Sequence, residues 1–157
     1  TIHDVWHSGS IEYHTGSISP NSLKGSEQNS VSQVVMNITN LRDSYYRNEN
    51  ARFRLYTRQK NWNPTIYTKA VSAPATYIVE SGSFKVVRLI DDLDVVAFGT
   101  GSDMHTQMSF DSSGSYFDVD MSMLEAGYGY GLKFAFYDGG AGAWNEYPDV
   151  FKFRVEE

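Results

Sequence analysis

Hydrophobic and polar residues alternate with a period of two in short runs from Gln33 onward, and Gly, Asn, Asp, Ser or Pro bounds each run. Such alternation is typical of half-buried β-strands, because successive side chains of a strand point to opposite faces. In one run, Phe53 and Leu55 would face a core while the arginines between them face solvent. The clearest strands predicted in this way are residues 34–39, 51–58, 116–121, 130–137 and 151–155.

Less regular runs complete the pattern. The slip at Val86-Val87 predicts either a bulge or burial on both faces in a strand over 83–90, and a turn at 91–94 leads to another strand over 95–98. A strand over 105–110, a hairpin loop at 111–115, an edge strand over 66–68 and a loop over 138–146 are also predicted. Together these elements predict an all-β protein, an immunoglobulin-like antiparallel β-sandwich of about seven to nine strands.

A turn spaced Leu-x-x-Gly-x-x-Tyr runs directly into the strand at 130–137. Its residues are Leu124, Gly127 and Tyr130. In immunoglobulin-like sandwiches, a Tyr near the start of the sixth strand donates its hydroxyl to the preceding crossover while its ring fills the core. We therefore interpret these three residues as a tyrosine corner, a structural motif and not a reactive one.

Residues 1–32 differ in composition from the rest of the chain. They carry eight serines and three of the four histidines, with only short apolar groups. Such a segment buries little apolar surface by itself, so we expect an extended N-terminal arm or linker at 1–32 that is either mobile or docked on a neighbour, followed by the sandwich at 33–157. The start at Thr1 is compatible with trimming, with maturation or with a segment of a longer chain.

Composition narrows the classes of function. The 157 residues suit one domain, and 15% aromatic residues favour strands. The absence of cysteine excludes disulfides and thiolate metal sites. The net charge of −6 argues against a nucleic-acid partner, which requires clustered positive charge, and no apolar run is long enough to predict a membrane partner.

Two groups of residues offer conceivable chemistry, and each has a simpler explanation. Asp118 and Asp120 project from the same face of one strand, as paired acid and base carboxylates can, but they also form the polar side of an amphipathic strand. Arg52, Arg54 and Arg58 alternate with aromatic residues as in RNA-binding sheets, and equally as on any solvated strand face. We expect no catalytic residue and no enzyme activity.

The sequence evidence for a metal site is similarly weak. The turn with Asp91, Asp92 and Asp94 and the segment 103–111 offer oxygen ligands without the spacing of a calcium-binding loop. His3, His7 and His14 could hold a surface metal only on a helix that Ser8, Gly9 and Ser10 disfavour. We expect no metal and no cofactor.

The stronger functional hypothesis is a contact surface formed by two loops. In an immunoglobulin topology the second-to-third and sixth-to-seventh strand loops share one end, where Trp is a common anchor for protein partners or sugars. The alternative is that each tryptophan folds back as a lid on the core. The candidate contact residues are Trp62, Asn63, Asp138, Trp144 and Tyr147.

Residues 33–157 resemble a known class of module. The resemblance lies in residues 41–45, 48–54, 61–67, 105–106, 111–114 and 116–120 and in the closing strand 151–155. These stretches are similar to β-sandwich modules in virion structural proteins of tailed bacteriophages, particularly marine T4-like phages. The resemblance implies a component of the phage particle that contacts other virion proteins and copies of itself, and it implies no catalytic residue. The alternative hypothesis is a carbohydrate-binding or adhesin module that recognises a cell-surface glycan through Trp62, Trp144 and Tyr147.

Overall fold

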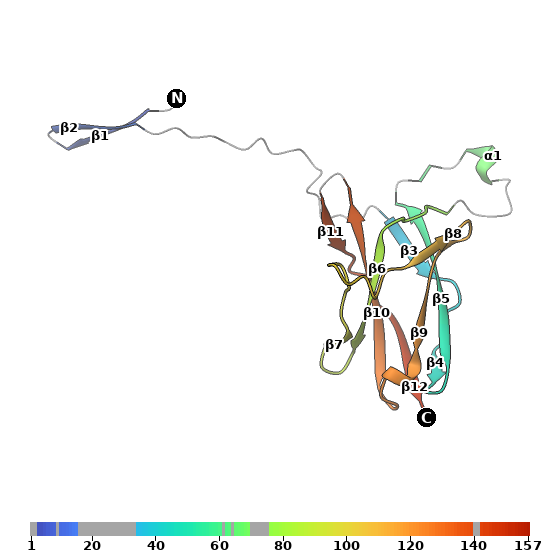
Figure 1. Cartoon of the computed structure of the whole chain (residues 1–157). Helices are drawn as coiled ribbons and strands as arrows, with labels where there is room; N and C mark the ends of the chain where they lie inside the picture. Colours follow the sequence, from blue (N-terminus) through green and yellow to red (C-terminus); the bar gives the residue numbers. More distant parts are fainter. Residues whose placement is uncertain are drawn as a thin grey trace. The chain divides into compact units, whose positions relative to one another are not determined.

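The computed structural model describes residues 3–8, 10–15, 34–60, 62–63, 65–69, 76–139 and 142–157 (Figure 1). Contacts divide the chain into two compact units, Thr1–Ser30 and Val31–Glu157. In the first unit, strands β1 (His3–Ser8) and β2 (Ser10–Thr15) form an antiparallel pair with Val5 opposite Tyr13. The segment predicted as an extended arm thus includes two paired strands, and residues 16–33 lie outside the described residues.

The second unit is an all-β sandwich of two sheets packed against each other, as the alternation predicted. Every pairing is antiparallel except the parallel pair of β4 and β12. One sheet has the order β3 (Val34–Ile38), β5 (Asn50–Gln59), β9 (Gly114–Asp120) and β8 (Ser109–Asp111). The other has the order β4 (Ser44–Tyr46), β12 (Phe151–Glu156), β10 (Gly129–Asp138), β6 (Gly82–Arg88) and β7 (Leu93–Val96), and β11 (Ala143–Glu146) also pairs with β10.

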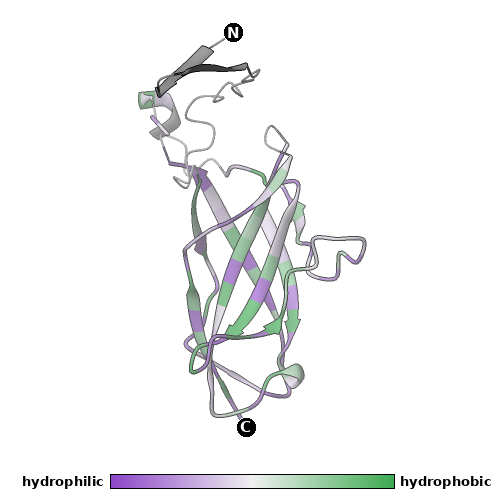
Figure 2. Ribbon diagram, turned by 90° about the vertical axis from the view of Figure 1, so that its left-hand side faces the viewer, coloured by the Kyte–Doolittle hydropathy of each residue, from purple (hydrophilic) through white to green (hydrophobic). Residues whose placement is uncertain are grey.

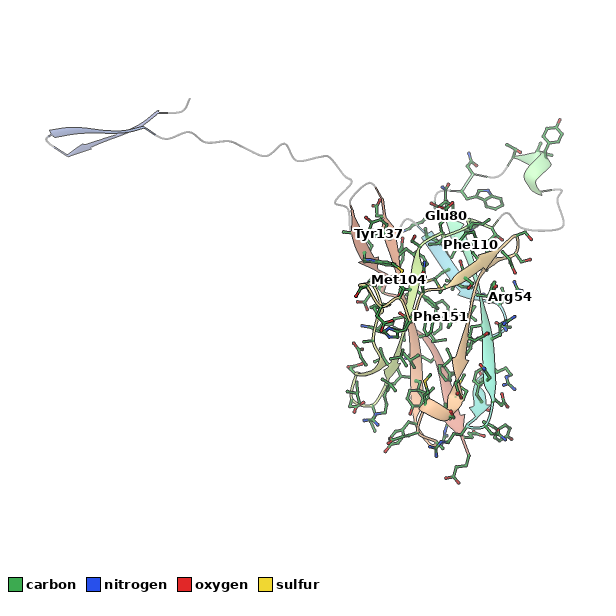
Figure 3. All side chains as sticks on the ribbon, viewed as in Figure 1. Arg54, Glu80, Met104, Phe110, Tyr137 and Phe151 are labelled. Atoms are coloured by element: carbon green, nitrogen blue, oxygen red, sulfur yellow. The ribbon has the colours of Figure 1, made fainter. Side chains whose placement is uncertain are left out.

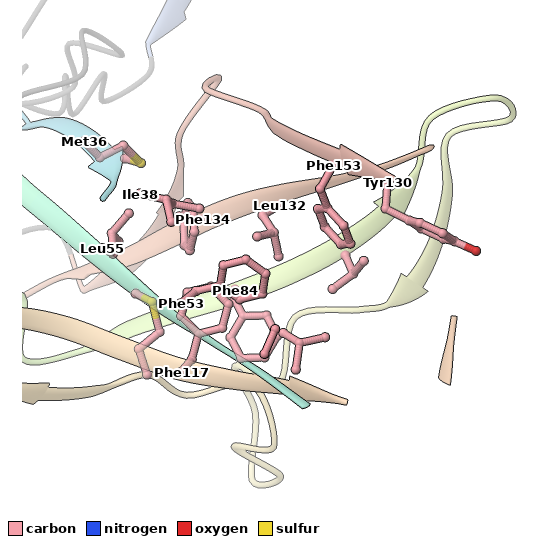
Figure 4. Close-up of a cluster of buried hydrophobic side chains, with 14 of the residues drawn as sticks. Met36, Ile38, Phe53, Leu55, Phe84, Phe117, Tyr130, Leu132, Phe134 and Phe153 are labelled. Atoms are coloured by element: carbon pink, nitrogen blue, oxygen red, sulfur yellow. The ribbon is translucent and has the colours of Figure 1, made fainter. Parts of the chain in front are cut away.

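Aromatic rings from both sheets form the core between them (Figure 4). The ring of Phe117 on β9 stacks on that of Phe84 on β6, with centroids 4.4 Å apart, and meets that of Phe134 on β10 edge-on at 5.7 Å. Phe53 and Leu55 are buried as predicted. Polar residues alternate with these along the strands, and hydropathy colouring makes the alternation visible (Figure 2). Hydrophobic burial between the layers is therefore the main source of stability.

Several local predictions need correction. Residues 66–68 do not form an edge strand, since Ile66–Lys69 is a single helical turn, α1. Strand β7 begins at Leu93 instead of residue 95, because Asp92 takes a positive φ of 52° and completes the preceding turn. The run predicted from 105 forms strand β8 only at Ser109–Asp111.

Val86 and Val87 are both buried, which confirms burial on both faces as the reason for the slip in alternation, and β6 pairs with β10 in regular register there. The register of β6 with β7 does shift at this point, but the extra residue is Val95 of β7. Two strands of the sandwich were not predicted. One is β11, which lies inside the predicted loop at 138–146, and the other is β4, of which Tyr45 alone is buried.

Candidate functional site

The connections β5–β6 and β10–β11 lie at the same end of the sandwich (Figure 1). The backbone N–H of Tyr77, on the chain entering β6, donates to the carbonyl of Thr57 on β5 at 2.8 Å. At the neighbouring strand, the N–H of Tyr137 donates to the carbonyl of Ser81 at 2.9 Å. These bonds fix both connections to the strand ends. We call the described residues 34–35, 58–60, 62–63, 65–69, 76–82, 136–139 and 142–145 the loop end.

The two tryptophans of the predicted contact surface have different neighbours at the loop end. The Arg58 guanidinium lies over the ring of Trp62, 5.5 Å from its centroid. Trp144 on β11 lies directly opposite Tyr137 on β10, with ring centroids 5.6 Å apart. Both tryptophans are half-buried, and Asn63 is exposed. Each ring is thus held at the surface by a neighbour from an adjoining strand.

Tyr147 belongs to the margin of the core more than to the free surface. Its ring lies 4.8 Å from that of Phe136, and its N–H donates to the Phe134 carbonyl at 2.9 Å. Burial, and then the nearby Tyr77 and Asp138, raise the pKa of Tyr147. Asp138 is exposed at the end of β10. Tyr147 therefore packs on Phe136, whose side chain points to the opposite face of β10 from that of Tyr137.

The most exposed apolar side chains of the loop end are residues that the sequence interpretation missed. Ile66 and Tyr67 on α1 are 85% and 86% exposed, and Tyr77, Ile78 and Tyr137 are exposed at the same end. Large exposed aliphatic and aromatic side chains are candidate anchors for a partner. The available signal was an apolar pair inside a proline-bounded stretch with no alternating continuation.

The residues predicted to form a tyrosine corner lie at the opposite end of the sandwich. The Tyr130 hydroxyl donates to the carbonyl of Glu125 at 2.9 Å, and burial raises the pKa of this phenol. Leu124 is buried, and Gly127 takes a φ of +88° while its N–H donates to the Val155 carbonyl at 2.7 Å. A φ of this sign suits glycine. These three residues hold the β9–β10 connection against β12.

Asp118 and Asp120 each have a structural partner. Asp118 accepts two hydrogen bonds from Arg52, at 2.8 and 2.9 Å, which lower the pKa of its carboxyl. Hydrogen bonds from Ser122, including one from its N–H at 2.9 Å, lower the pKa of Asp120. Both carboxyls are therefore held ionised, whereas an acid–base pair requires one of them to retain a proton. This geometry favours the amphipathic-strand interpretation.

The arginines beside Asp118 are also engaged on the outer face of the four-stranded sheet. Arg54 contacts Asp111 at 2.9 Å. The guanidinium groups of Arg52 and Arg54 lie 5.2 and 5.5 Å from the centroid of the Tyr116 ring between them. This ladder joins β5, β9 and β8 and balances the charge of the two arginines.

Carboxylates of the acidic turn that was considered as a calcium site are paired with basic side chains. The Arg88 guanidinium donates to Asp91 at 2.6 and 3.0 Å and to Glu125 at 3.0 Å, and it lies over the Tyr128 ring. The hydrogen bonds from Arg88 lower the pKa of Asp91. Asp94 instead contacts the amine of Lys85 at 3.6 Å.

Among the described residues, no group of three or more His, Asp or Glu side chains could hold a metal ion, and no helix is long and apolar enough to cross a bilayer. Backbone register places His14 opposite Asp4, and His3 and His7 opposite Thr15 and Ile11, on strands instead of the helix that a shared site would need. The side chains of these histidines lie outside the described residues.

Comparison of the chain with protein-family models, with curated proteins and with solved structures finds no match.

Proposed function

We propose that the chain is a non-enzymatic structural module that acts through protein–protein contacts at its loop end. The observation that carries the proposal is the exposure of Ile66 and Tyr67, joined at the same end by Tyr77, Ile78 and Tyr137. Large apolar and aromatic side chains are the usual anchors of protein interfaces. Backbone hydrogen bonds to Thr57 and Ser81 hold Tyr77 and Tyr137 at the strand ends, whereas Ile66 and Tyr67 lie on α1 in the connection between β5 and β6.

The proposal includes an immunoglobulin-like class for the sandwich. The order β3-β5-β9-β8 corresponds to strands A, B, E and D of that fold, and β12-β10-β6 corresponds to G, F and C. The hydrogen bond from Tyr130 to Glu125 occurs at the start of the strand that corresponds to F, where the tyrosine corner of that fold lies. Strand order and corner support this assignment independently.

The proposed setting is the particle of a tailed bacteriophage, in contact with other virion proteins and with copies of this chain. The resemblance of residues 33–157 to virion β-sandwich modules supports it, and a rigid sandwich with an apolar end suits a lattice or tail component.

Purified particles provide the test. Quantitative mass spectrometry should find the chain at a fixed copy number relative to the other virion proteins, and cross-linking in intact particles should connect Lys60, at the loop end, to a virion protein. Absence of the chain from particles in which the other structural proteins are detected would overturn the assignment to the virion. Cross-links confined to residues outside the loop end would overturn the proposed contact surface.

A second candidate function is glycan binding, which the Tyr137–Trp144 pair at the surface favours. Sugar rings stack on such aromatic faces. A glycan array compares the wild type with Trp144→Ala, and Met104→Ala, an exposed residue of the β7–β8 connection, serves as the control. Binding that Trp144→Ala abolishes and Met104→Ala retains supports this function, and no binding by folded wild type rejects it.

A further inference from the structure

Exposed hydrophobic side chains are concentrated at the two ends of the sandwich. Of the fourteen that are exposed among the described residues, six lie at the loop end and six at the other end. The opposite end, here called the corner end, comprises residues 42–50, 88–93, 120–129 and 154–157. Its exposed hydrophobic residues are Tyr46, Leu89, Ile90, Leu93, Met123 and Tyr128.

Hydrogen bonds show that these segments form one end. The N–H of Met121 donates to the Glu49 carbonyl at 3.0 Å, that of Arg47 to the Glu156 carbonyl at 2.9 Å, and that of Leu89 to the Gly129 carbonyl at 3.0 Å. The connections of both sheets thus meet there around the C-terminal strand (Figure 1).

The two ends differ in charge. The corner end contains eight carboxylates and four arginines, a net charge of −4. Among the loop-end residues whose side chains are described, Arg58 and Lys60 balance Glu80 and Asp138. Repulsion therefore disfavours contact between two corner ends, while the cationic groups of a loop end attract the acidic end of another molecule.

The sides of the sandwich offer less exposed hydrophobic surface for contact with a partner. Of the two remaining exposed hydrophobic residues, Met104 lies on the side of the sandwich, whereas Phe110 on β8 lies beside Glu80, next to the loop end (Figure 3). The outer face of the four-stranded sheet carries the charge-balanced ladder of Arg52 and Arg54. The outermost strands β7, β4, β8 and β3 have four, three, three and five residues, and strands this short give little backbone for lateral pairing.

We propose that the loop end of one copy docks on the corner end of a second copy of this chain, so that molecules associate head to tail. Ile66 and Tyr67 would then cover the apolar surface around Ile90 and Met123, while Arg58 and Lys60 face the acidic residues of the neighbour. A heterologous contact of this kind leaves one free end of each type and extends into a ring or a filament. The inference rests on the proposed contact function and names its partner.

Sedimentation velocity of the purified full chain tests it. Wild type should associate beyond a dimer as its concentration rises, and less at high salt. Tyr67→Glu at the loop end and Ile90→Lys at the corner end should each raise the association Kd about tenfold or more, and Met104→Glu on the side should leave it unchanged. Circular dichroism establishes that each variant is folded.

The decisive sample is an equimolar mixture of Tyr67→Glu and Ile90→Lys. Each variant keeps the end that the other lacks, so head-to-tail docking predicts one-to-one complexes in a mixture whose components are separately monomeric. Two like ends in contact would not be restored by mixing, so monomers in the mixture contradict the inference.

A wild type that stays monomeric at every concentration also contradicts it. If particle cross-links nevertheless join Lys60 to another virion protein, the proposed function stands and only the identity of the partner is wrong.

Discussion

The Tyr130 side chain illustrates how much a single residue contributes to this fold. Its ring is 1% exposed and stacks on that of Phe153 at 6.0 Å, while its hydroxyl reaches the Glu125 carbonyl. One side chain therefore fills the core and satisfies a backbone acceptor at the β9–β10 connection.

Replacement of Tyr130 by Phe keeps the ring and removes the hydrogen bond. We expect the free energy of unfolding to fall by about 1 kcal/mol, because the Glu125 carbonyl loses its donor at a partly buried position. Urea unfolding should show a lower midpoint with an unchanged slope. Tyr137→Phe, which alters an exposed phenol, is the matched control and should keep the wild-type midpoint. Equal midpoints for the two variants would contradict the role of the corner.

The carboxylates that accept hydrogen bonds from arginine make the stability of the fold depend on pH in the acidic range. The hydrogen bonds from Arg52 and Arg88 lower the pKa values of Asp118 and Asp91 in the folded state. The stability that such a group contributes is complete above its unfolded pKa, near 3.8, and is lost as the pH falls through the lower folded value.

We therefore expect the unfolding midpoint in urea to fall below about pH 4. Asp118→Asn should lower stability at neutral pH and reduce this acid dependence, because the ionised acceptor of Arg52 is gone. Asp149→Asn, at an exposed position of the β11–β12 connection, is the control and should retain the wild-type profile. A profile for Asp118→Asn identical to wild type would show that the ion pair adds no stability.

Two glycines of β10 show how closely a neighbouring segment approaches a strand. A Cβ at Gly131 would lie 2.6 Å from Val150 Cγ1 and 3.1 Å from Leu89 Cδ2. At Gly129 the nearest atom, Leu89 Cδ1, would be 3.6 Å away, an ordinary contact. Val150, which follows β11, and Leu89, which follows β6, can therefore pack on the outer face of β10 because Gly131 has no side chain there.

The pair gives a matched test of this packing. Gly131→Ala should destabilise the protein by about 1 kcal/mol or more, because Val150 must move and its branched side chain has little freedom. Gly129→Ala should be neutral or slightly stabilising, since alanine loses less backbone entropy on folding. Thermal unfolding midpoints measure both. The prediction is wrong if the two variants have equal midpoints.

Prediction of the elements from sequence was accurate where one face of a strand is buried and one is exposed. Strands β3, β5 and β10 match their predicted runs within two residues because alternation follows directly from burial. At Ile66-Tyr67-Thr68, β-branched and aromatic residues favoured a strand, but these residues lie beyond the sheet and form α1. Tyr67 was therefore missed as an exposed residue, since propensity reports conformation and not exposure.

β11 shows the limit of the same approach at the candidate site. Its sequence, Ala-Trp-Asn-Glu, has no alternation, and its strand conformation comes from hairpin pairing with β10. The composition of the loop therefore indicated Trp144 as a candidate contact residue, but only the pairing of β10 with β11 identifies Tyr137 as its neighbour.

The two units of the molecule differ in how much buried core supports their strands. The second unit contains the buried core, whereas the strands described in the first unit form a sheet of only two. An isolated two-stranded sheet is marginally stable in water, because its hydrogen bonds and side-chain pairs scarcely offset the loss of conformational entropy. Stability in this chain is thus expected to be local to the sandwich, with β1 and β2 depending on a partner surface.

Amide hydrogen exchange distinguishes that arrangement from a hairpin that is stable alone. In the purified chain at low concentration, amides of β1 and β2 should exchange much faster than those of β5 and β10, whose opening requires disruption of the core. In the intact particle, or in an associated form, the same amides should gain protection if a neighbour supplies a further strand or an apolar surface. Strong protection of β1 and β2 in the monomer would instead mean that the first unit has a core of its own, and docking would then be unnecessary for its order.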